Sequence, residues 1–521
     1  MTCRRSVALV SLVLLSAAWA PAGGPSGAEI SEKVRAYRAR NEVRIVRELA
    51  ALVALPNVAA FPEDMEANAE HLTGLLESRR FEVELLRAEG GPPVVFAQRR
   101  SEAAEFTVVF YAHYDGQPVA SELWRSDPWA VTVREGRLEA GAEQAPFDAL
   151  EAPIDPEWRL YGRSVSDDKV SIVALLTALD ALDAAGIVPG VNIKLLLDGE
   201  EERGSPHIAE ILRSHRDLFA ADLWVFCDGP MHQTRLPQVV FGVRGVTSVE
   251  ITAFGAAVGL HSGHYGNWAP DPGMLLARLV ASMRDVDGNL LIDGIDELVR
   301  PLGETAAAAI ENAPPVDEQL KDDLSLGWTE GQPTPLAERI TRPAVNLLGF
   351  SVGQVGAKAK NAISPQAEAV VGFRLVPDVT PEAVRAAVEE HIRAQGFYIV
   401  REAPDEAVRR EHARVVRLEW KKGYPALRTD MDLPVAKTVA RIVDEAVDGP
   451  IVLTPSLGGS LPLYAFSEIL GAPPIVVVPI ANHDNNQHAP NENLRIANLW
   501  QGIEIYAALM ARLGEATTSP N

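Results

Sequence analysis

The chain has 521 residues, of which 47% are hydrophobic and 23% charged, and its formal net charge is −23. That balance is typical of a soluble globular protein with a sizeable core, and the length favours two domains over one. A strongly acidic chain is poorly suited to polyanionic partners, so we expect neither nucleic acid nor an anionic membrane surface among its partners.

Residues 1–22 have the layout of a secretory signal peptide. An arginine pair at 4–5 precedes an apolar run at 7–18, and Ala20-Pro21-Ala22 offers a small-residue cleavage site. The apolar run is shorter than the roughly 20 residues of a membrane-spanning helix, which makes an uncleaved anchor the weaker alternative. We therefore expect an exported protein, periplasmic or extracellular, with no membrane attachment after leader cleavage.

From residue 29 to 240, apolar strand-like runs alternate with helical patterns. Strands are predicted at 106–113, 191–198 and 222–228, and a helix at 171–186. Continuous apolar strands separated by helices indicate a sheet that is covered on both faces, as in an α/β domain. The Pro- and Ala-rich stretch at 139–157 is interpreted as an irregular insertion.

The pattern changes between residues 241 and 428. The predicted order is strand, helix, two strands, helix and strand, at 245–255, 270–283, 344–353, 367–377, 380–396 and 397–402. This β-α-β-β-α-β order is typical of a ferredoxin-like α+β unit. The α/β pattern resumes over 429–514, so we predict one α/β domain interrupted by an inserted α+β domain.

Acidic and histidine residues follow the predicted strands or lie in the loops near them. Their positions are His113, Asp115, Glu200–Glu202, Asp228, the "SDDK" segment at 166–169, His483 and His488. Because the ligands of open α/β sheets gather outside the carboxyl ends of the strands, these side chains are expected to converge on one edge of the sheet.

A mixed set of His and carboxylate ligands without Cys suits zinc, with manganese and cobalt as alternatives. Two divalent ions about 3.5–4 Å apart need a bridging carboxylate, and their charge would offset the clustered negative charge of the glutamates at 200–202. One of these glutamates can then bind metal, while a neighbour that points the other way stays free to move protons.

Four motifs resemble those of the dinuclear-zinc metallopeptidases of the carnosinase, cytosolic dipeptidase, aminoacylase and succinyl-diaminopimelate desuccinylase type, which are zinc-dependent exopeptidases. The motifs are "HYD" at 113–115, "SDDK" at 166–169, "GEEERGS" at 199–205 and "HAPNE" at 488–492. The similarity covers nearly the whole chain after the leader. It implies a zinc-exopeptidase-like α/β catalytic domain with an inserted lid and dimerisation domain.

The resemblance implies a role for each motif residue. The implied metal ligands are His113, Asp167, Glu202, Asp228 and His488, with Asp167 bridging two ions. Glu201 is implied to be the general base, and Asp115 to orient the His113 imidazole. Ser164 and Val170 stand where the family usually has glycine, which leaves the local turn geometry open.

Motifs outside the ligand set imply how the substrate is held. "LHSGHYGN" at 260–267 carries His261, which is implied to reach the active site of a neighbouring subunit in a homodimer and to polarise the scissile carbonyl. "FRLVP" carries Arg374, which is implied to hold the free carboxylate of the substrate. Gly459 and Ser460 belong to a Gly-rich loop whose backbone is implied to approach the substrate.

We predict an exported dinuclear-metal hydrolase that cleaves a small peptide at the bond next to a free C-terminal carboxylate. An N-acyl-amino-acid amidohydrolase is the first alternative, because metal ligands do not distinguish a peptide from an acyl amide. A non-catalytic peptide-binding relative is the second alternative. The presence of Glu201 and of all five ligands argues against it.

Overall fold

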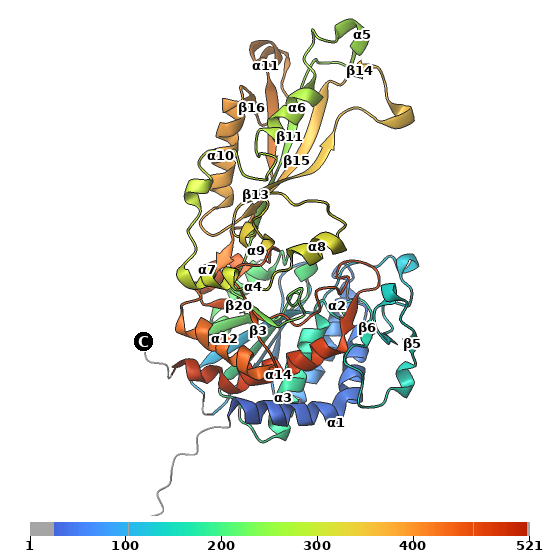
Figure 1. Cartoon of the computed structure of the whole chain (residues 1–521), viewed down its shortest axis with the longest axis vertical. Coiled ribbons are helices and arrows are strands. Elements are labelled where there is room, and N and C mark those ends of the chain that lie inside the picture. Colours follow the sequence, from blue (N-terminus) through green and yellow to red (C-terminus); the bar gives the residue numbers. More distant parts are fainter. Residues whose placement is uncertain (1–25, 103, 462, 518–521) are drawn as a thin grey trace, which may run out of the picture.

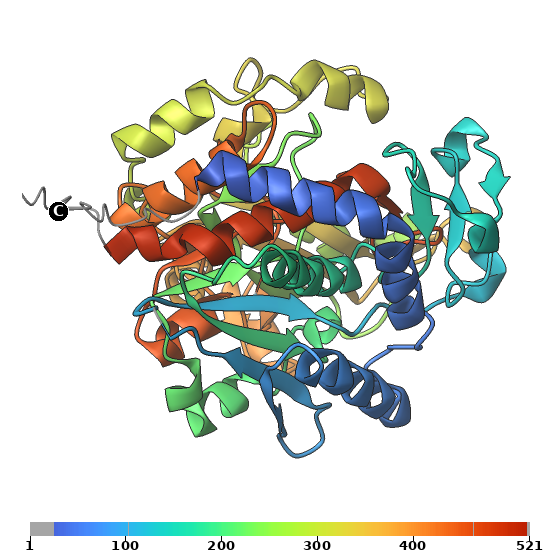
Figure 2. The ribbon, with the colours of Figure 1, turned by 90° about the horizontal axis from the view of Figure 1, so that it is seen from below.

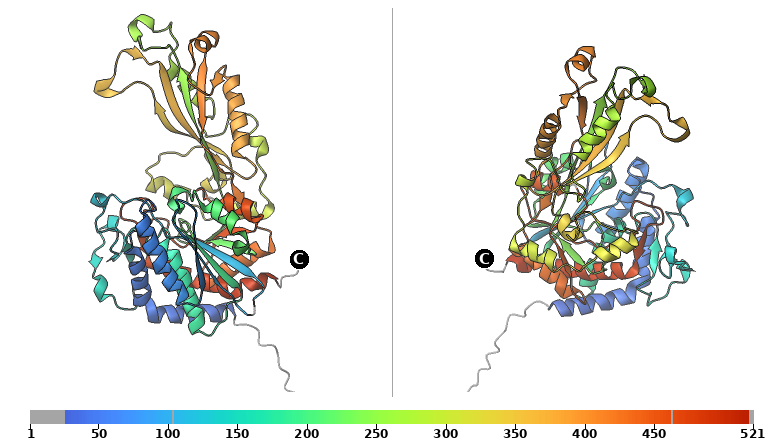
Figure 3. Two further views of the ribbon diagram at one scale, coloured as in Figure 1. Left: turned by 180° about the vertical axis from the view of Figure 1, so that it is seen from behind. Right: turned by 45° about the horizontal axis from the view of Figure 1, so that its top comes forward.

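The computed structural model describes residues 26–102, 104–461 and 463–517. The predicted signal peptide lies outside the described residues. Within those ranges, no helix combines the length and the apolar character needed to cross a bilayer. The chain forms an α/β domain and an inserted domain that rises from it (Figure 1, Figure 3).

The α/β domain is organised around an eight-stranded mixed sheet in the order β1-β2-β7-β3-β8-β20-β9-β19. Its strands are β1 (Glu82–Leu86), β2 (Val94–Arg99), β3 (Thr107–His113), β7 (Asn192–Asp198), β8 (Leu223–Phe226), β9 (Gln238–Val240), β19 (Val452–Thr454) and β20 (Ile475–Val477). The central strands β7, β3, β8 and β20 run parallel, so their carboxyl ends meet at one edge of the sheet. The predicted strands at 106–113, 191–198 and 222–228 are β3, β7 and β8.

Helices cover both faces of this sheet. The helices α1 (Gly27–Val53), α3 (Lys169–Ala184), α12 (Pro434–Ala446) and α14 (Ile496–Arg512) pack together on one face (Figure 2). The helices α4 (Ile208–Ser214) and α13 (Leu463–Leu470) belong to a second buried cluster on the other face, and α2 (Pro62–Glu77) packs beside β1 and β2. Burial on both faces explains why the central strands are apolar at nearly every position.

The stretch at 139–157 is largely irregular, as the sequence predicts, and it is anchored to the α/β domain. It contributes β5 (Gln144–Ala145) to a small sheet with β4 (Thr132–Arg134), β6 (Arg159–Tyr161) and β21 (Asn493–Arg495). Leu150 and Ile154 are buried in the domain core, and Ile154 N donates to Glu42 Oε2 over 2.7 Å. Single apolar side chains, which show no strand periodicity in the sequence, hold this stretch in place.

The inserted domain carries a five-stranded sheet in the order β13-β15-β11-β17-β16, with α6 and α10 packed against it. Its elements are β11 (Gly245–Phe254), α6 (Pro272–Ala281), β13 (Ala344–Ser351), β15 (Gln366–Leu375), α10 (Pro381–Ala394), β16 (Tyr398–Val400), α11 (Glu406–Glu411) and β17 (Val415–Trp420). β17, for which the sequence analysis predicts no strand, pairs with β11, so β16 lies at the sheet edge. The predicted fold class, an α/β domain with an inserted α+β domain, is confirmed.

Part of the predicted inserted range packs on the α/β domain. This segment holds α7 (Glu304–Glu311), α8 (Asp317–Asp323) and α9 (Leu336–Arg339), and α7 packs beside the edge strand β19 of the large sheet. Ala306 is buried in the core of the α/β domain, and Thr305 Oγ1 donates to Asp432 Oδ1 over 2.8 Å. By its contacts, this segment belongs to the α/β domain, although it lies within the range predicted for the inserted domain. The predicted domain boundaries at 240 and 428 therefore stay predictions.

The chain passes between the two domains through two paired segments. β10 (Gly242–Val243) pairs antiparallel with β18 (Leu427–Arg428), and Gly245 approaches the backbone just before β18. A β-carbon on Gly245 would lie 2.5 Å from backbone atoms of residues 424–426. Backbone atoms, unlike the end of a flexible side chain, cannot rotate out of the way, so glycine is required at this crossing.

We therefore expect Gly245→Ala to destabilise the protein by about 1–3 kcal/mol, the usual cost of an overpacked site. Gly259→Ala, also in the inserted domain, is the matched control because the nearest atom to its added methyl, Ile363 O, lies 3.8 Å away. Calorimetric unfolding of both variants measures the difference. Equal unfolding midpoints for the two would contradict the close approach at the junction.

Candidate metal centre and active site

Three neighbouring parallel strands deliver predicted ligands to one edge of the large sheet. His113 is the last residue of β3, residues 201–202 lie in the turn after β7, and Asp228 follows β8 by two residues. β3 pairs with β7 on one side and with β8 on the other. The loop before α3 adds Asp167, and the loop after β20 adds His488.

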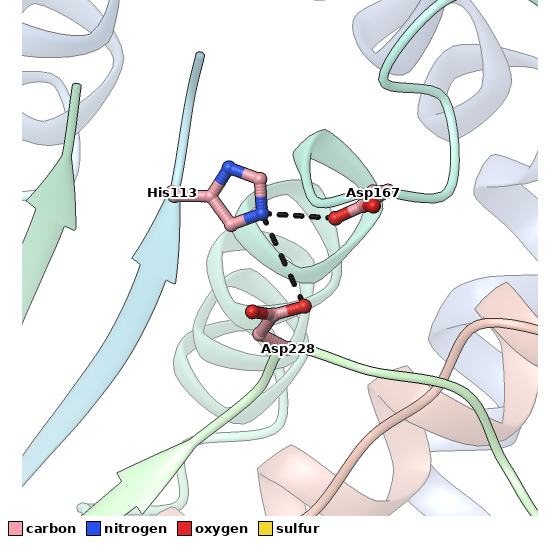
Figure 4. A group of neighbouring side chains, drawn as sticks. All are labelled: His113, Asp167 and Asp228. Carbon is pink, nitrogen blue, oxygen red and sulfur yellow. Dashed lines mark hydrogen bonds and ion pairs between the residues drawn. The ribbon is translucent and has the colours of Figure 1, made fainter. Parts of the chain in front are cut away.

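The first group of candidate ligands is His113, Asp167 and Asp228, all of them buried. His113 Nε2 lies 2.9 Å from Asp167 Oδ1 and 4.0 Å from Asp228 Oδ1. One ligand atom from each residue falls within 4.8 Å of the other two. Figure 4 shows the three side chains pointing toward one another from three separate segments, which is the convergence that a shared ion requires.

A second group, Asp167, Glu202 and His488, adjoins the first. His488 Nε2 lies 3.2 Å from Asp167 Oδ2 and 3.0 Å from Glu202 Oε2. Asp167 thus presents one carboxylate oxygen to each imidazole, as a bridging ligand must. His483 belongs to neither group among the described residues. The fold therefore brings together all five residues that the sequence predicts as ligands.

The electrostatics of these side chains fit a pair of divalent cations. Burial and nearby carboxylates raise the pKa of Asp228 to about 7, and burial and the Asp228 charge raise the pKa of Glu201 well above its ordinary value. Carboxylates packed this closely repel one another unless positive charge lies among them. Imidazole nitrogen and carboxylate oxygen donors, without cysteine sulfur, suit zinc, manganese or cobalt. The residues present fit a dinuclear metal centre.

The three adjacent glutamates have separate surroundings. Glu200 is buried, and its Oε2 lies 2.9 Å from His207 Nδ1. Glu202 belongs to the second ligand group. Glu201 lines the cavity beside the ligands, and within the described part of the chain no donor hydrogen-bonds to its carboxylate. A carboxylate that is free beside two groups of candidate metal ligands is placed as a proton-transferring base has to be.

Asp115 connects the histidine motif to the glutamate turn. Its carboxylate accepts hydrogen bonds from Glu201 N over 3.0 Å and from Glu202 N over 3.2 Å. Asp115 Oδ1 also lies 3.3 Å from His113 Nδ1. These contacts set the direction of the His113 ring and hold the backbone that carries both glutamates.

Sequence reasoning missed Glu492, which organises the loop that carries Asp167. This fully buried carboxylate accepts hydrogen bonds from the backbone N–H groups of Ser164, Ser166 and Asp167, over 2.9 to 3.0 Å. Glu492 lies in the same "HAPNE" motif as His488, so it ties the loops of two ligands together. The motif itself is visible in the sequence, but backbone partners leave no residue signature that could reveal this role.

The structure accommodates both departures from the usual glycines. Ser164 adopts a φ of 61°, a left-handed conformation that glycine takes more easily. Its hydroxyl accepts a hydrogen bond from Asn57 Nδ2 over 3.0 Å, which gives the strained residue a fixed partner. Val170 is fully buried within α3. The turn that the sequence leaves open is formed with these two residues in place.

The predicted carboxylate-binding residues adjoin the metal groups. Arg374, near the end of β15, donates from Nη1 to Ser460 Oγ over 2.7 Å, and Gly459 O accepts from Arg244 N over 3.2 Å. A cavity of about 510 Å³ is lined by Gly459 and Ser460 together with Asp167, Glu201, Asp228 and His488. The Gly-rich loop thus joins the inserted sheet to the ligand groups.

The guanidinium of Arg374, which donates to Ser460, and that of Arg244, which donates to Arg342 O over 3.1 Å, have no acidic partner in the described part of the chain. Within the described ranges, no carboxylate oxygen lies within 4.0 Å of Arg374 or Arg244. Burial and the positive charge of Arg374 lower the pKa of Arg244 to about 10. Neighbouring positive charges without a counter-charge favour a bound anion such as a carboxylate. Sequence reasoning missed Arg244, because its closeness to Arg374 depends on the pairing of β11 with β15.

His261 lies away from the metal groups of its own chain. It ends β12 (Leu260–His261), which pairs with β14 (Ala362–Ile363), beside the short helix α5 (Ser262–Tyr265) at the tip of the inserted domain (Figure 1). Its ring is exposed and lies 4.5 Å from the His264 ring, measured between centroids. If His261 takes part in catalysis, it would therefore do so at the active site of another subunit.

Parallel central strands whose ends gather two His and several carboxylate groups around a shared Asp are typical of a dinuclear metal-dependent hydrolase. Peptidase family M20/M25/M40 matches residues 109–512. The chain belongs to this family, and it is a metallopeptidase of the dipeptidase and carboxypeptidase type. The resemblance stated from the sequence motifs is confirmed.

Relatives of known name agree with this membership. The chain is 26% identical over 436 residues to the Cys-Gly metallodipeptidase dug1 of Schizosaccharomyces pombe, which spans 82% of this chain and 84% of that protein. It is 24% identical over 435 residues to the Beta-Ala-His dipeptidase of Homo sapiens, with 81% and 78% covered. The crystal structure of the M20 family metallo-carboxypeptidase Sso-CP2 from Sulfolobus solfataricus has a TM-score of 0.72 and 25% identity, covering 90% of this chain and 99% of that one.

Proposed function

We propose that this metallopeptidase cleaves small peptides, dipeptides above all, at the bond next to a free C-terminal carboxylate. The observation that carries the proposal is one cavity that is lined by members of both ligand groups (Asp167, Asp228 and His488), by Glu201 and by Ser460, whose hydroxyl accepts a hydrogen bond from Arg374. Binding of the carboxylate at Arg374 would hold the substrate amide in this cavity. The names of the relatives, a Cys-Gly and a Beta-Ala-His dipeptidase, support a dipeptide substrate.

Glu201 is the general base in this proposal. Two divalent cations, when bound, polarise the scissile carbonyl and lower the pKa of the attacking water. Glu201 accepts a proton from that water and then donates a proton to the departing amine. Asp115 accepts a hydrogen bond from the backbone N–H of Glu201 and so keeps the Glu201 carboxylate at the cavity wall. Zinc is the metal that we propose, with manganese and cobalt as alternatives.

Comparing free dipeptides with their C-terminal amides tests the proposal. The planar guanidinium of Arg374 pairs two-pronged with a carboxylate, which a lysine ammonium cannot reproduce. A charge-assisted pair contributes about 1.5–3 kcal/mol, so we expect kcat/KM to be at least about tenfold lower for the amides. Arg374→Lys should lose most of this discrimination. Arg385→Lys, at a half-exposed position on α10, is the matched control and should keep it.

The same measurements separate the candidate functions. Equal kcat/KM on free and amidated dipeptides would contradict the carboxylate clamp and favour a broader amidase. Faster turnover of N-acyl amino acids than of dipeptides would favour the amidohydrolase alternative. No turnover of either class by the metal-loaded protein would favour the non-catalytic, peptide-binding alternative.

The homodimer that we propose forms through the inserted domain. β13 is an edge strand, and it exposes Leu347, Leu348 and Phe350. Trp268, in the loop after α5, is 80% exposed. An exposed apolar edge strand is a template for pairing with another chain. A symmetric pairing of two copies would carry each His261 toward the other subunit.

We also propose that the protein is exported. Support comes from the arginine pair, the apolar run and the small-residue cleavage site within residues 1–22. The first described helix, α1, begins at Gly27, a few residues beyond the proposed cleavage site. Cleavage after residue 22 would therefore leave every described element in place.

A further inference from the structure

The cavity at the metal groups has a polar side and an apolar side. Its polar side is formed by Asp167, Glu201, Asp228 and His488. Its apolar wall consists of Met231, Ile310, Leu336, Ile340, Leu453 and Leu457. These apolar side chains can neither hold a metal ion nor bind a carboxylate. They must therefore contact a different part of the ligand, and a cavity of about 510 Å³ is large enough for more than a peptide backbone.

The apolar wall is held in place by the fold. Ile310 and Ile340 come from the segment of α7 to α9, which Ala306 anchors in the core of the α/β domain. Ile340 Cδ1 lies 3.2 Å from the position that a β-carbon on Gly458 would occupy, so the segment packs directly on the Gly-rich loop. Because the wall is preformed, an apolar group that displaces water from it gains binding free energy without reordering the protein.

We infer that the substrate carries a large apolar group, either a bulky side chain or an acyl chain, which packs against this wall while its carboxylate binds Arg374. The inference rests on the proposed function and specifies the substrate class for the same site. A glycine dipeptide would leave the wall in contact with water. Apolar pockets discriminate by about 10–200-fold for one methylene, so the preference for an apolar substrate should be large.

Kinetics of the metal-loaded enzyme on three substrate pairs test the inference. Leu-Gly against Gly-Gly varies the amino-terminal side chain, and Gly-Leu against Gly-Gly varies the carboxy-terminal one. N-octanoyl-glycine against N-acetyl-glycine varies an acyl chain. We expect kcat/KM to be at least about tenfold higher for the apolar member of one pair or more. The pair that responds identifies which group of the substrate contacts the wall.

Variants of the wall connect the preference to this cavity. Ala313 lines the cavity, so Ala313→Phe should fill it with a ring and remove the preference. Ala308→Phe, exposed on α7 and outside the lining, is the matched control and should retain the preference. Leu336→Gln, at a lining position that is 40% exposed, should also reduce the preference. It serves as the second variant if the phenylalanine disturbs folding.

Two results would overturn the inference: equal kcat/KM within all three pairs, or a preference that both folded wall variants leave unchanged. If Gly-Gly is cleaved as efficiently as the apolar substrates, the apolar subsite is contradicted but the proposed function is not. Absence of turnover on every dipeptide and acyl amide would contradict the proposed function itself. Calorimetric binding of N-octanoyl-glycine against N-acetyl-glycine would then still decide whether the wall selects an apolar group.

Discussion

Glu201→Gln is expected to lower kcat by about 10²–10⁴-fold, the usual contribution of a general base, while the metal content and the thermal stability stay unchanged. Glu201 belongs to neither ligand group, so its replacement removes no metal ligand. Glutamine keeps the size of the side chain and loses only the capacity to accept a proton. Steady-state kinetics, elemental analysis and calorimetry on one sample measure the three quantities.

Glu202→Gln is the matched comparison, because the two residues are adjacent in one turn. Glu202 Oε2 lies 3.0 Å from His488 Nε2 and accepts from Gln117 Nε2 over 2.8 Å. This variant should therefore lose bound metal as well as activity. Loss of metal from Glu201→Gln, together with an active and metal-retaining Glu202→Gln, would show that the roles of the two glutamates are the reverse of those proposed.

His261→Ala is expected to lower kcat by about 10²–10³-fold, the usual effect of removing one group that stabilises an oxyanion. The ring is exposed at the tip of the inserted domain, so the fold and the metal content should not change. His264→Ala, which removes the neighbouring ring 4.5 Å away, is the matched control. Kinetics and elemental analysis of both variants separate a catalytic effect from a structural one.

Mixing two inactive variants tests whether His261 acts across subunits. In a mixed dimer of His261→Ala and Glu201→Gln, one site has both its own Glu201 and the histidine of its partner. Random pairing of equal amounts should restore activity to about a quarter of the sites. Full activity in a protein shown to be a monomer, or no recovery despite demonstrated subunit exchange, would contradict the proposal.

The convergence of the five predicted ligands could be foreseen, because each lies near the end of a predicted element and four of them belong to short motifs, while Asp228 follows a predicted strand. The sequence does not reveal that β3 lies between β7 and β8. The strand order is not needed to predict where the ligands meet, because any order of parallel strands places their carboxyl ends at the same edge of the sheet. His113, residues 201–202 and Asp228 therefore converge whatever the order.

The inserted domain has features that hydrophobic periodicity does not predict. Periodicity predicts α6, α10 and most of its strands correctly, but it predicts neither α11 nor the place of β17 beside β11. It also assigns residues 304–339 to this domain by position, whereas Ala306 packs in the core of the other one. A short helix shows its apolar face in the sequence, but not the surface that this face will cover.

By itself, the sequence determined the fold class and the interrupted α/β domain, because hydrophobic periodicity is a local property of a chain, and its motifs proposed five candidate ligands through a family resemblance. Only the tertiary structure decided which distant groups meet. It placed Glu492 under the loop of Asp167, Arg244 close to Arg374, and the segment of α7 to α9 against the cavity. These arrangements depend on backbone hydrogen bonds, strand pairing and long-range packing, none of which leaves a pattern of residue types in the sequence.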